Sequence, residues 1–306
     1  MSDYVVAVDL GGTLTKVAYA ERDGTTGPAA RLETLSVSGQ VSVPWLADVL
    51  TAAVRDRPQG RCLGYAVVVP GIIDVAAGVV RAGANVGWYD LPLRDRLTAA
   101  TGLPGTVGHD VRSGGLAEWR VGAGRGVANL LFLALGTGIA GAMVTDGRLL
   151  DADGYGGEIG HTAVTAAEGL DCRCGQRGCL ETVASATGVS RTYGRLAGTG
   201  APDAQAVADL ARAGDPHGVA AYALAVRALT EALLGYATLL APGTIVVGGG
   251  LAGAFDLVGP PVQAGLAAAM TFQRRPLLVP AQLGPDAGVI GAGLVGWDRV
   301  RQEENA

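Results

Sequence analysis

The chain has 306 residues, a formal net charge of -5 and a pI near 5.2. This length is enough for two domains that each bury a hydrophobic core. The acidic balance excludes a general basic surface, so we expect neither nucleic acid nor an anionic membrane as a partner.

The first hundred residues alternate strand-like and helix-like segments. Three β-rich runs come first and predict an antiparallel meander; they cover 4–8, 16–21 and 31–37. A helix, a buried strand, a second helix and a short strand are then predicted at 44–55, 63–69, 91–100 and 106–109. The last of these strands ends immediately before Asp110.

The second half of the chain repeats this layout. A strand at 129–135, a glycine turn and a returning strand at 139–144 resemble the opening of the chain. This likeness predicts duplicated α/β domains that face a cleft. An irregular insert, a long helical region, a strand and a final helix are predicted at 154–180, 203–240, 244–247 and about 287–301.

No low-complexity linker separates the two halves, so we expect tightly hinged domains. The smaller domain is predicted at 1–117, and the larger domain, which carries the insert, at 118–286. The C-terminal helix, at about 287–306, is expected to pack back on the first domain.

Two features of the chain bear on localisation. The N-terminal residues lack both a basic region and a long apolar run, so no signal peptide is expected. The uncharged stretch 232–255 is interrupted by Pro242, Gly243 and a glycine triplet, which predicts a soluble core rather than a membrane span. We therefore expect a cytoplasmic protein with reduced thiols.

Three of the four cysteines lie in a compact cluster with one histidine. The cluster has the spacing His-x10-Cys-x-Cys-x4-Cys and consists of His161, Cys172, Cys174 and Cys179. Three thiolates and an imidazole make a complete tetrahedral set for zinc and leave no position for a water nucleophile. The alternative is a disulfide, but Cys-x-Cys is too short to bridge comfortably. We predict a structural Zn²⁺.

The 49 glycines include three turns that each follow a strand. In the first turn, the amides of Gly11 and Gly12 and the hydroxyl of Thr13 can approach a phosphate. Asp9 is placed to hold a hydrated Mg²⁺. Lys16, the single lysine of the chain, is a phosphate candidate or a solvated strand-end residue. A simple hairpin turn is the alternative for the whole motif.

Two further stretches match Gly-x-Gly-x-x-Gly, at 136–141 and 248–253. Neither lies in the first βα unit, which argues against a dinucleotide fingerprint, and a P-loop sequence is absent. We predict instead that three glycine turns converge on one nucleotide, the third of them under its adenosine. The nucleotide-binding residues predicted in the second and third turns are Gly136, Thr137, Gly138, Gly248, Gly249 and Gly250.

Asp110 lies between a predicted strand and a helix, where its carboxylate can project into a cleft or cap the helix. Phosphoryl transfer to an alcohol requires a group that accepts the hydroxyl proton, and Asp110 is our candidate for this catalytic base. Glu158, His161 and Glu181 offer the paired acceptors that a polyhydroxyl ligand needs. The alternative for the two glutamates is a surface position at helix ends.

The motifs together resemble the ROK family of bacterial sugar kinases, within the actin-like and hexokinase ATPase superfamily. Its first phosphate motif resembles Asp9-Leu-Gly-Gly-Thr, its second resembles Gly136-Thr-Gly-Ile-Ala-Gly, and its adenosine motif resembles Val247-Gly-Gly-Gly. Its signature resembles Glu158-Ile-Gly-His and Cys172-Arg-Cys-Gly-Gln-Arg-Gly-Cys-Leu-Glu.

This resemblance implies two actin-like α/β domains flanking a cleft, and a homodimer. It also implies ATP as phosphoryl donor and Asp110 as catalytic base for the sugar 6-hydroxyl. Glu158, His161 and Glu181 would bind the sugar ring, and His161 would ligate zinc as well. We add Gly71 and Asn85 to the predicted sugar-binding residues.

The chain departs from the family pattern beside the catalytic base. The family usually has Asn-Asp-Ala-Asn, whereas this chain has His109-Asp110-Val111-Arg112. The asparagine replaced by His109 commonly contacts the sugar 3- and 4-hydroxyls, so we hypothesise glucose or an analogue altered at C3 or C4, such as 3-amino-3-deoxyglucose (kanosamine). An imidazole can accept from an ammonium or donate to a hydroxyl according to its tautomer.

Two other functions compete with a kinase. Some ROK proteins are repressors that carry an added N-terminal helix-turn-helix, for which the strand predicted at 4–8 leaves no room. A catalytically silent sugar sensor is the other, and the presence of Asp110 with all three glycine turns argues against it.

Overall fold

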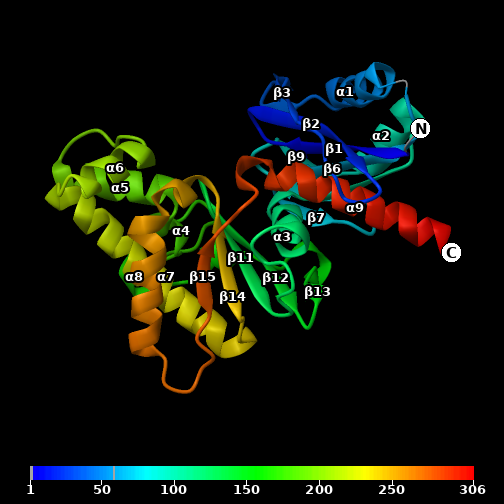
Figure 1. Cartoon of the computed structure of the whole chain (residues 1–306). Coiled ribbons are helices and arrows are strands. Elements are labelled where there is room, and N and C mark those ends of the chain that lie inside the picture. The colour runs from blue at the N-terminus through cyan, green and yellow to red at the C-terminus, as the bar shows by residue number, and fades with distance from the viewer. Residues whose placement is uncertain (1–2, 58) are drawn as a thin grey trace. The chain divides into compact units, whose positions relative to one another are not determined.

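The computed structural model describes residues 3–57 and 59–306. The chain forms two compact units, and Figure 1 labels most of their helices and strands. Unit 1 contains the described residues up to 117 together with 151–156 and 285–306. Unit 2 contains 118–150 and 157–284.

Unit 1 is built on a five-stranded sheet with the strand order β10-β6-β1-β2-β3. The strands β1, β2 and β3 form an antiparallel meander, as the sequence predicted, and β6 and β10 extend the sheet in parallel with β1. The five strands are β1 (Tyr4–Leu10), β2 (Leu14–Glu21), β3 (Ala30–Glu33), β6 (Cys62–Val69) and β10 (Gly105–His109). Apolar side chains alternate or run continuously along the central strands, which leaves β1 and β6 almost wholly buried.

Helices cover both faces of this sheet. The helices α1 (Val43–Asp56) and α2 (Leu93–Thr101) pack on one face, and α9 (Ala287–Glu304) packs on the other. Figure 1 shows α9 running along the sheet. Its close approach depends on glycine, because a Cβ added to Gly296 would lie 2.5 Å from the side chain of Val5. α3 (Asp110–Val121) starts directly after β10.

Unit 1 also contains small strands. One of them, at 36–37, is the end of the run predicted at 31–37, and the sequence did not predict the others. Together they form a three-stranded antiparallel sheet and a two-stranded ribbon. Their bounds are β7 (Ile72–Asp74), β8 (Val79–Gly83) and β9 (Trp88–Leu91) for the sheet, and β4 (Ser36–Val37) and β5 (Gln40–Val41) for the ribbon.

Unit 2 has a five-stranded sheet of the order β13-β12-β11-β14-β15. The hairpin of β11 (Leu130–Leu135) and β12 (Ile139–Thr145) repeats the β1–β2 hairpin of unit 1, and β14 joins β11 in parallel. The remaining strands are β13 (Arg148–Leu149), β14 (Thr244–Gly248) and β15 (Leu277–Pro280). The related openings predicted for the two halves are therefore confirmed.

A helical layer packs on the unit 2 sheet around one large apolar core. It consists of α4 (Glu181–Ala184), α5 (Ala186–Ala197), α6 (Ala204–Arg212), α7 (Pro216–Leu240) and α8 (Phe255–Ala269). The helical region predicted at 203–240 is confirmed, and Gly214 at φ +82° and the N-cap Asp215 divide it into α6 and α7. Short 3-10 turns complete the chain: η1 (Ala152–Gly154), η2 (Ile159–His161), η3 (Thr165–Ala167), η4 (Gly250–Ala254) and η5 (Gly284–Asp286).

α7 is the one helix in the described residues that is long and apolar enough to cross a membrane. The core helix of a folded domain passes the same test, and α7 packs against α5, α6 and α8 in unit 2. The predicted break after it is confirmed, since α7 ends at Leu240 and β14 begins at Thr244.

Candidate active site and metal centre

The first glycine turn joins β1 to β2 in unit 1. The N–H of Gly11 donates to the carbonyl oxygen of Leu14 at 3.0 Å, and the hydroxyl of Thr34 donates to the carbonyl oxygen of Gly11 at 2.8 Å. A Cβ added to Gly12 would lie 2.5 Å from the carbonyl oxygen of Asn85, so this position requires glycine. The turn is therefore tight and braced, with the side chain of Thr13 exposed.

Asp9 and Lys16 face each other across the β1–β2 hairpin. The Lys16 ammonium donates to Oδ2 of Asp9 at 3.2 Å and to the carbonyl oxygen of Pro285. Burial raises the pKa of Asp9, Lys16 opposes that shift, and the carboxylate of Asp110 adds to it. Lys16 is thus occupied by Asp9 rather than extended from the glycine turn, which the sequence could not indicate.

The carboxyl ends of three parallel strands place candidate residues at one edge of the unit 1 sheet. Asp9 on β1 pairs with Val68 on β6, and His109 on β10 pairs with Val69. Gly71 follows β6 at φ +121°, where an added Cβ would lie 2.1 Å from the carbonyl oxygen of Ala82. The structure therefore brings Asp9, Gly71, His109 and Asp110 to the edge where open α/β sheets bind ligands. Asn85 reaches this edge through its contact with Gly12.

Asp110 is the first residue of α3, and its Oδ1 accepts the N–H of Val111 at 2.7 Å. Its side chain keeps 30% of its surface exposed, so the carboxylate can be reached from solvent. Burial by surrounding atoms raises its pKa, while the hydrogen bond from Val111 opposes the shift. A carboxylate with a raised pKa is a better proton acceptor, as a general base requires.

His109 is buried, with 8% of its side chain exposed. Its Nδ1 accepts the backbone N–H of Arg112 at 3.2 Å and lies 3.3 Å from Oδ1 of Asp110, which itself accepts the N–H of Val111. With Nδ1 as an acceptor, the neutral ring is assigned its proton on Nε2. Burial, aided by the nearby Arg112 charge, lowers the pKa of His109 to about 3. The imidazole is consequently neutral at physiological pH, and Nε2 is a hydrogen-bond donor.

The second and third glycine turns lie side by side in unit 2, at the ends of the paired strands β11 and β14. The second turn is closed by the N–H of Gly136, which donates to the carbonyl oxygen of Gly138 at 2.9 Å. In the third turn Gly249 has φ +82°, and an added Cβ would lie 2.6 Å from the carbonyl oxygen of Leu135. Gly249 and Gly250 are exposed, and Gly248 is buried.

Glu181 starts α4 and reaches the second glycine turn. Its Oε2 accepts the N–H of Ile139 at 2.8 Å, and a Cβ added to Gly138 would lie 2.4 Å from the same oxygen. From the sequence, Glu181 is predicted as a sugar ligand, with a surface position at a helix end as the alternative. This contact joins residues 42 positions apart and left no signal in the sequence.

His161, Cys172, Cys174 and Cys179 meet in unit 2 with their four ligand atoms within 4.8 Å of one another. The Sγ atoms of Cys174 and Cys179 are 3.7 Å apart, as are Sγ of Cys172 and Nδ1 of His161. Tetrahedral zinc with bonds of about 2.3 Å to sulfur separates two sulfurs by about 3.8 Å. The cluster is therefore compatible with a zinc site.

The two edges of the His161 ring face different groups. Nδ1 faces Cys172, and Nε2 lies 3.9 Å from Oε2 of Glu158. Burial, followed by the neighbouring thiols, raises the pKa of Cys179 to about 12 in the absence of a cation. Three crowded thiols of this kind become thiolates when a divalent cation offsets their charge.

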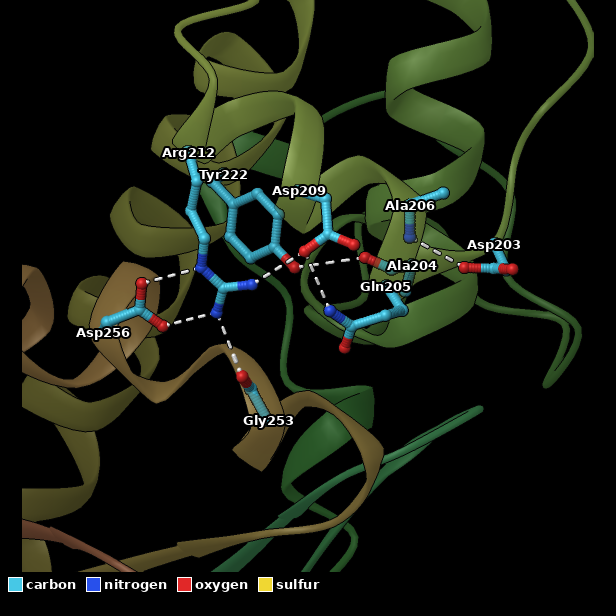
Figure 2. Close-up of polar contacts among 9 residues, drawn as sticks. All are labelled: Asp203, Ala204, Gln205, Ala206, Asp209, Arg212, Tyr222, Gly253 and Asp256. Atoms are coloured by element: carbon cyan, nitrogen blue, oxygen red, sulfur yellow. Dashed lines mark hydrogen bonds and ion pairs between the residues drawn. The ribbon is translucent and has the colours of Figure 1, made fainter.

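A further polar cluster, not predicted from the sequence, joins α6 to α8 and to η4, the 3-10 turn that begins at Gly250 (Figure 2). Arg212 of α6 binds both oxygens of Asp256 of α8, at 3.0 and 2.7 Å, and also donates to Oδ1 of Asp209 at 3.0 Å. The same guanidinium donates to the carbonyl oxygen of Gly253 in η4 at 3.0 Å. These bonds fix η4 against α6 and α8. Only the Asp209–Arg212 spacing was visible in the sequence.

Comparisons with known proteins agree on one family. The model of the ROK family matches residues 5–296. A glucokinase of Halalkalibacterium halodurans is 34% identical over 100% of this chain and 98% of its own length. The ROK hexokinase structure of Thermus thermophilus has a TM-score of 0.82 at 30% identity, over 98% of this chain and 99% of that chain. A ROK family glucokinase structure of Streptomyces griseus, in complex with glucose and AMPPNP, has a TM-score of 0.81 at 25% identity, over 96% and 99%. These likenesses confirm the expected two-domain α/β fold.

Proposed function

The chain belongs to the ROK family, and on that premise we propose that it is an ATP-dependent hexose kinase. The observation that carries the proposal is Asp110, an accessible carboxylate with a raised pKa at the carboxyl edge of the unit 1 sheet. Relatives that are glucokinases over nearly the full chain support the same activity.

In the proposed reaction Asp110 orients the sugar 6-hydroxyl and accepts its proton as the oxygen attacks the γ-phosphorus of ATP. The phosphoryl group passes to the sugar oxygen, and ADP leaves with the electron pair of the broken bond. Glycine-turn amides at Gly11, Gly12, Gly136 and Gly138 are proposed to bind the phosphates. The turn at Gly248, Gly249 and Gly250 is proposed to lie under the adenosine.

Two metal ions belong to this proposal. Asp9 is the residue proposed to hold Mg²⁺ through water, and bound Mg²⁺ neutralises charge that develops on the phosphates. His161, Cys172, Cys174 and Cys179 are proposed to hold Zn²⁺, which when bound contributes folding free energy and offers no open coordination position. Glu158, His161 and Glu181 are proposed to bind the sugar, and Gly71 and Asn85 are proposed as further sugar-binding residues. The protein is proposed to act as a cytoplasmic homodimer.

His109 is proposed to select the sugar. Because Nδ1 is occupied by the N–H of Arg112, Nε2–H is the ring group proposed to donate to an acceptor on the substrate. A hydroxyl oxygen and an unprotonated amine both have a lone pair, whereas an ammonium has none. We therefore narrow the hypothesis to glucose or an analogue altered at C3 or C4 whose substituent accepts a hydrogen bond, with kanosamine bound as its free amine.

A sugar panel tests this proposal. Initial rates with Mg-ATP are measured for glucose, 3-amino-3-deoxyglucose, 3-deoxyglucose and the C4 epimer galactose, with the wild type and with His109→Asn. We expect the wild type to phosphorylate glucose and the amino sugar, which both offer an acceptor at C3, faster than 3-deoxyglucose, and His109→Asn to shift the ratio of the two rates toward glucose. Glucose turnover unmatched by any amino or deoxy analogue in the wild type would refute the altered-sugar hypothesis and leave the kinase activity standing.

A further inference from the structure

Ile139, the residue that closes the second glycine turn, is contacted on both sides by the segments around the metal cluster. Its N–H is bound by Oε2 of Glu181 at 2.8 Å. Its carbonyl oxygen lies against Gly160, where an added Cβ would be only 2.2 Å away. Ile139 itself is buried, with 3% of its surface exposed. The position of this residue, and so the end of the turn, is set by Gly160 and Glu181.

The other end of the same turn is held by the chain that follows Glu181. The N–H of Ala186 donates to the carbonyl oxygen of Gly136 at 2.8 Å. Ser185 anchors this chain, because its hydroxyl donates to the carbonyl oxygen of Glu181 at 2.8 Å and accepts the N–H of Gly188 at 3.0 Å. The turn between β11 and β12 is thus fixed at both ends by residues 181–186.

The metal ligands flank these contacts in the sequence. His161 follows Gly160 directly, and Cys179 precedes Glu181 by two residues. The N–H of Leu180 donates to the carbonyl oxygen of Thr162 at 2.9 Å, which already joins the two segments. A metal ion held by His161 and Cys179 would close a ring of contacts around Ile139.

Glu181 has one carboxylate oxygen on the turn and one that is free to bind a substrate. Oε2 is engaged by Ile139, and Oε1 has no hydrogen bond within the described part of the chain. The side chain is only partly buried. The two oxygens can therefore serve two different partners.

We propose, on the premise of the proposed kinase function, that Glu181 is a positioning residue for the nucleotide phosphates as well as a sugar ligand. Through Ile139 it holds the amides of the second glycine turn in the arrangement that binds phosphate, with or without a sugar present. A residue that only bound sugar would not affect nucleotide affinity in the absence of sugar.

Sugar-free nucleotide binding separates the two roles. Dissociation constants for the Mg²⁺ complex of AMPPNP are measured by calorimetry in the zinc-loaded protein, without sugar, for the wild type, Glu181→Ala, Glu181→Gln and Glu231→Ala. We expect Glu181→Ala to weaken binding about tenfold, since it removes a hydrogen bond to a charged acceptor. Glu181→Gln keeps an oxygen for the Ile139 N–H and should stay within about threefold of the wild type.

Glu231→Ala is the matched control, because Glu231 is a carboxylate of unit 2 that binds the N–H and hydroxyl of Thr165. It should leave both the sugar affinity and the sugar-free nucleotide affinity unchanged. Unchanged nucleotide affinity in Glu181→Ala, with sugar affinity lost, would overturn the positioning role. A wild type that binds no AMPPNP would instead refute the proposed function.

Amide hydrogen exchange in the ligand-free protein tests the same contact without any substrate. We expect the Ile139 amide to exchange faster in Glu181→Ala than in the wild type, while amides of β11 and β12 away from the turn keep their protection. If Glu181→Ala does not fold, Glu181→Asp replaces it in both measurements, because its side chain is one methylene too short to reach Ile139. Wild-type exchange at Ile139 in the folded variant would contradict the proposal.

Discussion

Replacing Asp110 by asparagine separates proton acceptance from structure at the proposed catalytic base. Oδ1 of Asp110 accepts the N–H of Val111 at 2.7 Å, and the amide oxygen of asparagine can keep this bond. The second carboxylate oxygen becomes an amino group, which cannot accept the proton of a sugar hydroxyl. We therefore expect kcat to fall by about 10²- to 10⁴-fold, with sugar and nucleotide affinities within about threefold of the wild type.

The same substitution should stabilise the protein. Burial raises the pKa of Asp110 above that of the unfolded chain, so its ionised form lowers the free energy of unfolding at neutral pH. This penalty is absent below both pKa values and grows as pH rises through the raised one. Asparagine removes it, and a gain on the order of 1 kcal/mol corresponds to a Tm increase of about 2–4 °C.

The assay is a coupled measurement of ADP release, followed by scanning calorimetry of the same preparations at pH 7.5. A variant with wild-type kcat would remove Asp110 from the base role. A large loss of Tm together with the loss of activity would mean that the carboxylate is structural, which contradicts the predicted gain in stability.

Three further predictions address the pH dependence, the metal centre and the core. Because the pKa of His109 is about 3, its ring stays neutral near pH 7 and should bind 3-amino-3-deoxyglucose only as the free amine. The value of kcat/KM for this sugar should therefore rise about tenfold per pH unit below the amine pKa of about 8, while that for glucose stays nearly flat. A decrease with rising pH would show that the ammonium is the bound form. Cys174→Ser should reduce the zinc content measured by mass spectrometry and lower Tm, whereas Cys62→Ser, a change on β6 of unit 1, should retain full zinc; equal zinc in both variants would refute the assigned ligand set. Glu118 is fully buried and accepts the N–H groups of Ala123, Gln282 and Leu283. Glu118→Gln turns amide hydrogens toward one or two of these donors, so it should lower the free energy of unfolding measured in urea by about 2–4 kcal/mol. A decrease of less than about 0.5 kcal/mol would contradict the assigned bonds.

The fold was predictable where apolar periodicity is strong. The buried strands β1, β6 and β11 and the helices α1 and α9 match the predicted segments closely, because each buries one continuous or periodic apolar surface. The sheet β7–β9 was missed because its strands are short and interrupted by glycine and charged residues. α8 was missed because Pro260 and Pro261 lie inside it.

The candidate site was predictable as a set of residues but not as a set of contacts. The sequence spacing predicted the metal cluster, because three cysteines and one histidine within nineteen residues are the ligand set of a structural zinc site. The contact of Glu181 with Ile139 and the bond of Arg212 to Asp256 join residues 42 and 44 positions apart. Similarly, the tautomer of His109 follows from the position of one backbone N–H, which no residue pattern reveals.

The central claim is transfer of the γ-phosphoryl group of ATP to the 6-hydroxyl of a hexose. Its most direct test is to incubate the wild type with Mg-ATP and each sugar of the panel, and to locate the phosphate on the product by ³¹P and ¹³C NMR. We predict a single phosphomonoester whose ¹³C–³¹P coupling falls on C6, formed with at least one member of the panel. Sugar binding without any phosphate ester would contradict the claim and favour a sugar sensor, and an ester at another carbon would contradict the role given to Asp110.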